Sequence, residues 1–291
     1  MKNFINKLKK TYWKIIKLYL YKRKILRYYK NNPEAEKYKP ELKYLKKHKV
    51  DFLLGNYVDA YKKLKIDVYY DFVNKLYYVL YDNKKLYFKR GLTKRNIIKI
   101  FRTLLSEQDA LSPHSYQSPD FYVNNGEILF DIGAAEGFFA LSVIDKVDKV
   151  YLFEYDEKWI EALYLTFKPY KHKVIIVSKF VSDIISNNSI SIDNFVQNID
   201  LLPTFIKIDV EGNEYKVLKG MENVLSLNNK IRISVCTYHN LNDAEILESF
   251  LSEKNFSINY SHNFMLYFRN TKTINIPYFV KGVLHAEKVS K

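Results

Sequence analysis

Hydrophobic residues in the second half of the chain fall into short continuous runs that alternate with segments of helical spacing. Short apolar runs bounded by turn residues are typical of buried strands, and apolar positions three or four apart are typical of helices. Strands are predicted from residue 128 and at 150–153, 174–177, 205–210 and 231–236, with helices at 157–167, 214–225 and 244–252. Two last runs, 256–260 and 265–268, are predicted to form a closing antiparallel pair. This alternation predicts an α/β fold with a doubly wound, mostly parallel sheet and helices on both faces.

The first 105 residues follow a different pattern, in which apolar and basic residues alternate at helical spacing. A first helix is predicted over 4–29 and ends before Pro33, because the residue preceding a proline is pushed out of helical geometry. Further helix is predicted within 35–64, a β-hairpin over 76–88 and another helix over 96–105. The chain is therefore divided into a basic, mainly helical region at 1–105 and an α/β domain at 106–291.

A glycine turn follows the strand that begins at residue 128. The strand runs into Asp131, glycines stand at 133 and 137, and the apolar spacing after Gly137 predicts a helix that begins near Phe138. Such a turn places bare backbone and a helix N-terminus at the carboxyl end of a parallel strand, where open α/β sheets bind their ligands. We therefore expect a ligand over Gly133, in contact with the turn that includes Ala134.

The chemistry of this turn indicates which ligand it binds. A dinucleotide-binding fingerprint has three glycines, whereas here Ala135 stands in the place of the second. Asp131 and Glu136 flank the turn, and two carboxylates suit a cationic ligand better than a diphosphate. S-adenosylmethionine carries a sulfonium and an ammonium group and no phosphate, so it is the predicted cofactor. The alternative is an ordinary turn with chance glycines.

An acidic residue also ends the second predicted strand. Glu154 lies 23 residues after Asp131, a separation at which a carboxylate can accept hydrogen bonds from both ribose hydroxyls of an adenosine. NAD shares that ribose, and the carboxylate could instead cap the following helix. Tyr155 joins Glu154 as a cofactor-binding candidate. Ser182 and Asp183, after the third strand, are candidates for contact with adenine, with a plain turn as the alternative.

Charged residues interrupt the fourth predicted strand. Alternation sends Lys207, Asp209 and Glu211 to one side of the strand, and charges there are costly unless they are paired or functional. The fifth strand ends close to His239, which would lie at the same edge of the sheet if the two strands are neighbours. His114 stands in a polar loop just before the sheet, and loops in that position often cover an active site.

Positive charge is concentrated at one end of the chain. The formal net charge is +15, and residues 1–50 hold 17 basic against 3 acidic residues, a net of +14. The remainder holds 30 against 29, a net of +1, so the α/β body offers no general surface for a nucleic acid. A basic amphipathic helix suits an anionic membrane surface, and a solvated helix that packs on its own domain or a partner is the alternative.

The sequence also bears on location. No apolar run approaches the roughly 20 residues of a membrane span, and no secretory cleavage site follows the first helix. Cys236 is the only cysteine, which excludes an internal disulfide and a cysteine-based zinc cluster and fits a reducing compartment. We expect a cytoplasmic protein, with residues 1–50 attached peripherally to the inner face of the membrane.

Several of these motifs together resemble the FkbM family of S-adenosylmethionine-dependent methyltransferases. The resemblance rests on FDIGAAEGFFAL at the glycine turn, YLFEYDE around Glu154, Ser191-Ile192-Asp193, and FIKIDVEGNEYKVLKG at the fourth strand, and it covers about residues 110–240. It implies a Rossmann-like class I methyltransferase with a seven-stranded sheet. Members act mostly as O-methyltransferases on sugars, glycans or other small hydroxylated metabolites.

The resemblance also implies roles for individual residues. Asp131, Gly133, Gly137 and Glu154 would hold the cofactor. Asp209 and Glu211 would face the methyl donor or the substrate.

A sugar hydroxyl is a poor nucleophile at neutral pH, so a general base is useful. His239 is the first candidate and His114 the second, with Asp209 beside them; a hydrogen-bonded structural histidine is the alternative. Asp209, Glu211 and His239 could also bind Mg²⁺ or Mn²⁺, because oxygen ligands suit these ions. A site without metal is equally compatible with the sequence.

The sequence thus predicts an O-methyltransferase that uses S-adenosylmethionine and acts on a hydroxyl of a sugar, a glycan or a similar small metabolite. One alternative is a nucleic-acid methyltransferase that grips its substrate with the basic arm, although the nearly neutral body disfavours it. Another is a non-catalytic adaptor that binds a membrane or a partner protein. The sequence does not indicate an oligomeric state.

Overall fold

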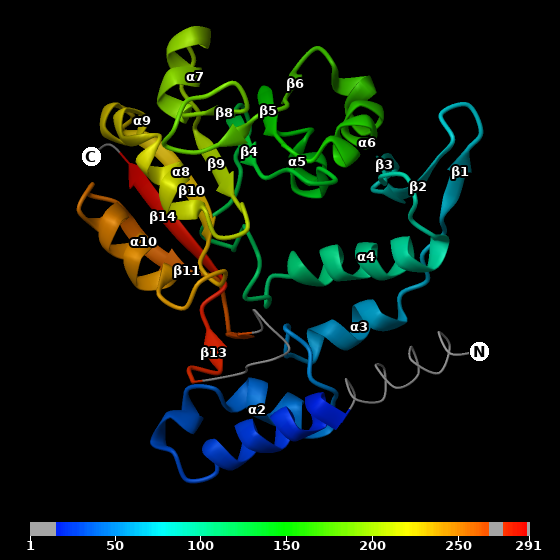
Figure 1. The fold of residues 1–291 in the computed structure, drawn as a ribbon, viewed down its shortest axis with the longest axis vertical. Coiled ribbons are helices and arrows are strands. Elements are labelled where there is room, and N and C mark those ends of the chain that lie inside the picture. Colours follow the sequence, from blue (N-terminus) through cyan, green and yellow to red (C-terminus); the bar gives the residue numbers. More distant parts are fainter. Residues whose placement is uncertain (1–15, 268–275, 290–291) are drawn as a thin grey trace.

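A central seven-stranded sheet organises the computed structural model, which describes residues 16–267 and 276–289. The strand order is β11-β14-β10-β9-β4-β5-β6, and β14 alone runs antiparallel to its neighbours (Figure 1). The strands are β4 (Ile128–Ile132), β5 (Lys149–Phe153), β6 (Val174–Val177), β9 (Phe205–Ile208), β10 (Lys230–Cys236), β11 (Ser257–Tyr260) and β14 (Val283–Val289). A seven-stranded, mostly parallel sheet of this kind confirms the predicted fold class.

Helices cover both faces of the sheet. On one face α4 (Lys94–Glu107), α5 (Phe138–Val143) and α6 (Glu157–Phe167) share a core with strand residues such as Leu129. On the other face a second core contains Phe130 and residues of α7 (Ile192–Ile199), α8 (Glu214–Lys219), α9 (Glu222–Leu227) and α10 (Asp243–Ser252). The neighbours Leu129 and Phe130 enter different cores because successive side chains of a strand point to opposite faces.

Two predictions for the α/β domain are wrong. Residues 256–260 do not pair with 265–268: β11 pairs with β14, and β12 (Met265–Leu266) pairs with β13 (Phe279–Val280). The predicted helix at 214–225 is split into α8 and α9 at Gly220, where a Cβ would lie 2.3 Å from the carbonyl oxygen of Ser182. This close approach of two backbones divides the helix, and the apolar periodicity continues through it unbroken.

The N-terminal region contains the predicted helices and hairpin. Residues 16–28 are helical, and the part of the first predicted helix before residue 16 lies outside the described residues. The other elements are the 3₁₀ turn η1 (Pro33–Glu36), α2 (Lys39–Lys47), α3 (Tyr57–Lys63), β1 (Tyr69–Asp71), β2 (Leu76–Tyr81) and β3 (Lys84–Tyr87). The hairpin of β2 and β3 turns through Asp82 and Asn83, both with positive φ, as a two-residue hairpin loop requires. Strand β1, which extends the hairpin, was not predicted.

The N-terminal helices build a third core together with the end of the chain. Ile25, Tyr29 and Leu45 lie in one cluster with Tyr278 and Phe279, and α2 and β13 are neighbours at one end of the molecule (Figure 1). The hairpin and α4, by contrast, belong to the main core. Because these cores include residues from both sides of position 105, the division at that position stays a prediction.

Candidate active site

The glycine turn after β4 is held in a conformation that leaves its backbone bare. Gly133, Ala135 and Gly137 all have positive φ, and the amides of Gly133 and Ala134 donate to the carbonyl oxygen of Phe153 in β5 at 2.9 and 3.1 Å. A Cβ at Gly133 would lie 1.9 Å from the carbonyl oxygen of Asp209. Only glycine fits there, so the turn approaches the end of β9 as closely as the backbone allows.

We expect alanine at position 133 to disrupt the turn. Gly91 is a matched control, because it has a similar φ of +82° but nothing lies within 4 Å of an added Cβ. Gly91→Ala should lower the free energy of unfolding by about 1–2 kcal/mol through backbone strain alone. Gly133→Ala should cost about 1–3 kcal/mol more through the clash and should also weaken binding of S-adenosylhomocysteine. Chemical denaturation and calorimetry measure the two effects, and equal losses in both variants would contradict the assignment.

Glu154 links the glycine turn to the next helix. Its Oε2 accepts from the amide of Ala135 and its Oε1 from the amide of Asp156, both at 2.7 Å. The cap of α6 is Asp156, whose side chain accepts from the amide of Lys158 at 3.1 Å. Each oxygen of Glu154 can accept a further hydrogen bond, so the carboxylate is fixed in place and still able to bind two hydroxyls.

Glu154 borders a cavity of about 430 Å³ at the carboxyl ends of β4, β5 and β9. Of the predicted cofactor-binding residues, Gly133, Glu154 and Tyr155 line it. The other predicted residues of the turn, Asp131, Ala134, Glu136 and Phe138, are buried around it, and Gly137 begins α5 as its N-cap.

The far wall of this cavity differs from the one expected. Ser182 is buried and donates to Asp183 at 2.9 Å, and neither residue lines the cavity. Trp159 of α6, Lys179 and Phe180 line it instead. These three residues follow the second and third predicted strands but belong to no recognisable motif. The sequence hints at them only through aromatic residues close to the ends of two strands.

A buried group of charges lies beneath the turn. Asp131 and Lys207 are register partners on β4 and β9, and Lys207 Nζ lies 3.1 Å from Asp131 Oδ1. The ammonium group also donates to the carbonyl oxygen of Gly133 at 2.5 Å. Burial alone would lower the pKa of Lys207, but Asp131 and Asp209 raise it above its ordinary value. Lys207 therefore stays charged and ties the strand to the turn.

Several acidic side chains lie around Lys207, which is a single positive charge. Burial raises the pKa of Glu136 to about 7, and burial together with the charges of Glu136 and Asp209 raises the pKa of Glu107 to about 8. Asp131 Oδ2 accepts no hydrogen bond from any described residue. Such an arrangement is stabilised by a further positive charge, so it fits a ligand that carries ammonium and sulfonium groups.

Asp209 lies at the centre of a polar cluster at the end of β9. Its Oδ2 accepts from the hydroxyl of Tyr116 at 2.7 Å, and its Oδ1 lies 3.6 Å from His239 Nε2. Burial would raise the pKa of Asp209, but Lys207, His114 and His239 together hold it below its usual value. Asp209 is therefore ionised near neutral pH.

His239 is held between carboxylates. Its Nδ1 lies 2.9 Å from Glu214 Oε1, and its Nε2 lies 3.7 Å from Glu211 Oε2. Burial would lower its pKa, but the contacts with Glu214, Asp209 and Glu211 raise it above the ordinary value. The role of Glu214 was not predicted from the sequence, because this acid reads as the first residue of a helix.

His114 lies deeper in the protein than His239. It is buried, its Nε2 is 2.8 Å from the hydroxyl of Tyr238, and burial lowers its pKa to about 4. The structure thus brings Asp209 and both predicted histidines together, with His239 at the surface of the cluster and His114 behind Tyr238.

A second cavity, of about 380 Å³, lies beside this cluster. Its lining residues are Phe52, Glu211, Tyr238, His239, Met265, Leu266 and Tyr267. Glu211 lines both this cavity and the cavity at Glu154. The two cavities therefore border the same residue just after β9, and a donor and an acceptor bound in them would be neighbours.

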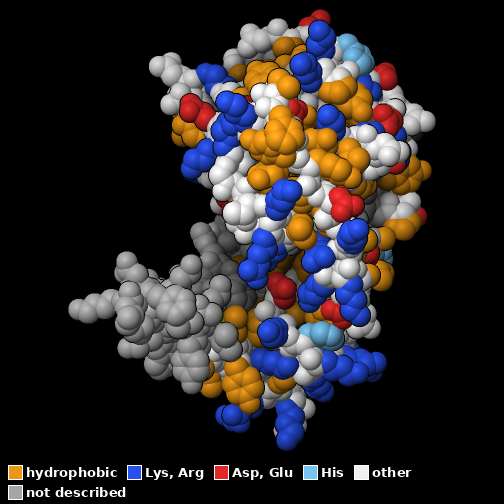
Figure 2. All heavy atoms as spheres, turned by 90° about the vertical axis from the view of Figure 1, so that its right-hand side faces the viewer, with side chains coloured by type: hydrophobic (Ala, Val, Ile, Leu, Met, Phe, Trp, Pro, Cys, Tyr) orange, Lys and Arg blue, Asp and Glu red, His pale blue; other side chains and the backbone are white. Residues whose placement is uncertain are grey.

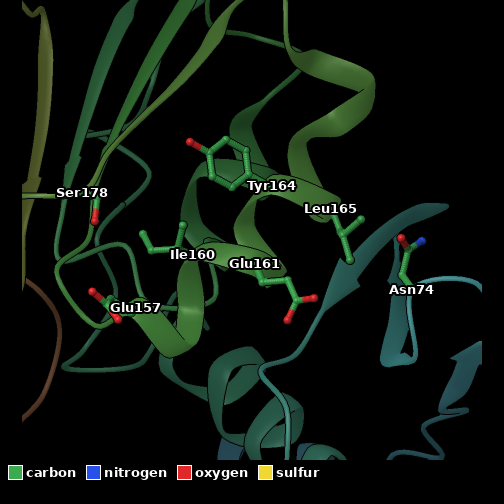
Figure 3. Close-up of a pocket in the computed structure, with 7 residues that line it drawn as sticks. All are labelled: Asn74, Glu157, Ile160, Glu161, Tyr164, Leu165 and Ser178. Carbon is green, nitrogen blue, oxygen red and sulfur yellow. The ribbon is translucent and has the colours of Figure 1, made fainter.

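A third, separate cavity lies between α6 and the β1–β2 turn. It has a volume of about 480 Å³ and is lined by Asn74 and α6 side chains such as Ile160 and Tyr164 (Figure 3). It shares no lining residue with the cavities at the strand ends. Its acids are Glu157 and Glu161, and Glu161 is paired with Arg90 at 2.5 Å, so we assign it no part in the chemistry.

The predicted metal ligands Asp209, Glu211 and His239 are neighbours, but the most compact group differs. Ligand atoms of Asp209, Glu214 and His239 all lie within 4.8 Å of one another, as do those of His114, Asp209 and Cys236. A raised pKa favours protonated His239, and burial raises the pKa of the Cys236 thiol well above its usual range. A metal bound here would have to displace these protons, because a metal needs the deprotonated ligand. The metal site stays a prediction.

The chain is similar to one protein family and to several solved structures. Residues 124–258 match the family model described as the methyltransferase FkbM domain. A comparison with curated proteins finds no match. Among solved structures, the methyltransferase FkbM from Methylobacillus flagellatus KT is similar at 19% identity and a TM-score of 0.45, over 67% of this chain and 56% of that chain.

Two other solved structures are similar over most of their own length. Precorrin-6y C5,15-methyltransferase from Geobacter metallireducens GS-15 is 10% identical, with a TM-score of 0.40, over 70% of this chain and 93% of that one. An rRNA methylase from Streptococcus thermophilus is 14% identical, with a TM-score of 0.39, over 58% and 90%. The named substrates of these proteins differ widely.

Proposed function

We propose that the protein, whose residues 124–258 match the methyltransferase FkbM domain, uses S-adenosylmethionine to methylate a hydroxyl group of a sugar, a glycan or a similar small metabolite. The observation that carries this proposal is that a second cavity shares Glu211 with the cavity at Glu154. Hydroxyl-bearing and ionisable side chains lie near Glu211, and polar groups of this kind suit an acceptor rich in hydroxyls.

The chain's own residues would bind and orient the cofactor, which supplies an electrophilic methyl group. Glu154, fixed by two backbone amides, would accept hydrogen bonds from the ribose hydroxyls. Gly133 allows the ligand to approach the backbone, and the buried acids near Lys207 offset the ligand's positive charge. Most of the rate would come from holding donor and acceptor in line in a site that excludes water.

His239 is the proposed general base. The negative charge of Glu214, whose Oε1 lies 2.9 Å from Nδ1, would favour a proton on Nδ1 and so leave Nε2 free toward the acceptor cavity, which His239 lines. Nε2 would take the proton of the acceptor hydroxyl as the oxygen attacks the methyl carbon. Asp209 would then stabilise the imidazolium that forms. His114 does not line the acceptor cavity and would position Tyr238.

This assignment predicts the pH dependence of the reaction. The folded pKa of His239 is raised, so activity should fall as the pH is lowered through a value above the ordinary 6.5, because the base becomes protonated. His239→Gln should lower kcat by about 10²–10⁴-fold and remove this limb of the profile. His172→Gln, which changes an exposed histidine, is the control. A pH profile of His239→Gln with its acidic limb intact would refute the role.

The proposed substrate class can be tested by following labelled methyl groups from S-adenosylmethionine into defined acceptors. We expect incorporation into sugars or glycans, in a linkage that is stable to base, as an ether is and an ester is not. Label that enters only RNA or DNA, and is released by nucleases, would replace the proposal with the nucleic-acid alternative. Activity that persists after exhaustive chelation would rule out the metal prediction.

We also propose peripheral attachment to an anionic membrane through the basic arm. Among the described residues, no helix is long and apolar enough to cross a membrane. Residues 16–50 supply core side chains such as Ile25 and Leu45, so the test should delete only residues 2–15, which carry five lysines. Deletion should reduce binding to acidic vesicles about tenfold or more, and equal flotation of both proteins would contradict the proposal.

A further inference from the structure

A large basic cavity, called the basic groove below, lies between α3 and α4. It has a volume of about 750 Å³, and its charged lining residues are Lys62, Arg95, Lys99 and Arg102, against Asp51 as the one acid in the lining. On this side of the molecule, Lys and Arg side chains gather around a hollow in the lower half of the view (Figure 2). The surplus of cations indicates a site for an anion.

The cations of this groove differ in whether a nearby acid neutralises their charge. Within residues 16–267 and 276–289, no ion pair involves Arg95 or Lys99, and Lys62 lies 3.6 Å from Asp59. Arg102 donates from Nε and Nη2 to the carbonyl oxygen of Leu64 at 2.8 and 2.5 Å. That carbonyl fixes the guanidinium in place and leaves its charge uncompensated, as a preorganised anion site requires.

The start of α4 adds to this positive field. The first turn of α4 contains Lys94 and Arg95 and no acidic residue, and Thr93 is its N-cap. Cations at a helix N-terminus oppose the helix dipole and destabilise the helix. The sequence thus places its cations where an isolated helix would prefer acids, and a bound anion would relieve the repulsion.

The basic groove lies next to the acceptor cavity. Phe52 lines both, and its carbonyl oxygen accepts from the amide of Leu266, another residue of the acceptor cavity, at 2.9 Å. The three cavities are therefore neighbours in succession, with Glu211 shared by the first two and Phe52 by the last two. The side chains around the cavities change from acidic, beneath the cofactor cavity, to basic, in the groove.

From this succession we propose that the groove binds a phosphate or diphosphate group carried by the methyl acceptor, so that the substrate is a phosphorylated sugar or glycan. The inference rests on the proposed function. The anionic group would dock on Arg95, Lys99 and Arg102 while the sugar enters the acceptor cavity past Phe52. The charge gradient would allow only one orientation, because a phosphate beside the buried acids would be repelled.

Inorganic pyrophosphate is the probe for this site, measured by calorimetry at fixed low salt. Charge reversal with Arg95→Glu/Lys99→Glu should weaken its binding at least tenfold. The matched control Lys168→Glu/Lys171→Glu changes the net charge equally, at exposed lysines outside the groove, and should leave binding nearly unchanged. S-adenosylhomocysteine affinity should be the same in all three proteins, which also shows that the variants are folded.

Several outcomes would overturn the inference. They are a lack of pyrophosphate binding by the unmodified protein, equal losses in both double variants, and a single-stranded RNA that binds the groove far more tightly than pyrophosphate does. Among acceptors, a sugar phosphate should be methylated with a higher kcat/KM than its dephosphorylated form, and only in the protein with an intact groove. Binding of S-adenosylhomocysteine without binding of pyrophosphate would remove this inference alone, whereas loss of both would remove the proposed function.

Discussion

Replacing Glu154 with alanine should reduce the affinity for S-adenosylhomocysteine by about 10²–10⁴-fold. The carboxylate would accept two hydrogen bonds from the ribose, and a hydrogen bond to a charged group contributes about 1.5–3 kcal/mol. The same substitution removes the acceptor for the amides of Ala135 and Asp156, so the turn loses part of its support as well. Titration calorimetry of the two proteins measures the loss directly.

Two further variants make this prediction specific. Glu154→Gln keeps one acceptor oxygen and should fall between the unmodified protein and Glu154→Ala. Glu157→Ala removes an exposed carboxylate three residues farther on, outside the cofactor cavity, and should change nothing. If Glu154→Ala bound the ligand as well as Glu157→Ala does, the ribose assignment would be wrong.

Replacing Lys207 with methionine should lower the free energy of unfolding by about 3–5 kcal/mol, because it leaves buried carboxylates without their cation. Lys207 is 4% exposed and Asp131 is 1% exposed, so water cannot take the place of the ammonium group. The lost bond to the carbonyl oxygen of Gly133 would also loosen the glycine turn. Urea denaturation at neutral pH gives the free energy.

A second substitution separates the charge effect from lost packing. In Lys207→Met/Asp131→Leu the register partners are both apolar, and part of the stability should return, because no buried charge of this pair remains. Lys158→Met, on the exposed side of α6, should stay within about 0.5 kcal/mol of the unmodified protein. A loss below about 1 kcal/mol in Lys207→Met would show that the pair is not the support described here.

The parallel part of the sheet could be predicted because its strands are continuous apolar runs. Strand β14 could not, since its sequence alternates apolar residues with His285 and Glu287. His285 is nevertheless buried, stacked on Phe121 and flanked by β10 and β11. The placement of this strand between β10 and β11 follows from tertiary packing, which the local sequence does not reveal. The split at Gly220 likewise depends on a distant backbone segment.

The site residues that could be predicted from the sequence are the polar and charged residues at the ends of strands. Asp209, Glu211, Glu154 and His239 follow strands in the sequence, and the parallel sheet brings them to one edge. The partners that set their protonation states could not be predicted.

These partners approach from other parts of the chain. Tyr116 comes from a loop 93 residues before Asp209, and Glu214 turns back from the first turn of a helix. Phe52, which lines both the acceptor cavity and the basic groove, comes from the loop between α2 and α3. No local pattern identifies contacts of this kind.

The central claim is that the cavity at Glu154 holds the methyl donor and opens at Glu211 onto the acceptor cavity. A crystal structure of the protein with S-adenosylhomocysteine tests it most directly. The account predicts ribose hydroxyls on the Glu154 carboxylate and the sulfur atom turned toward the end of β9, between Asp209 and Glu211. Ligand bound elsewhere, or with its sulfur directed away from the acceptor cavity, would contradict it.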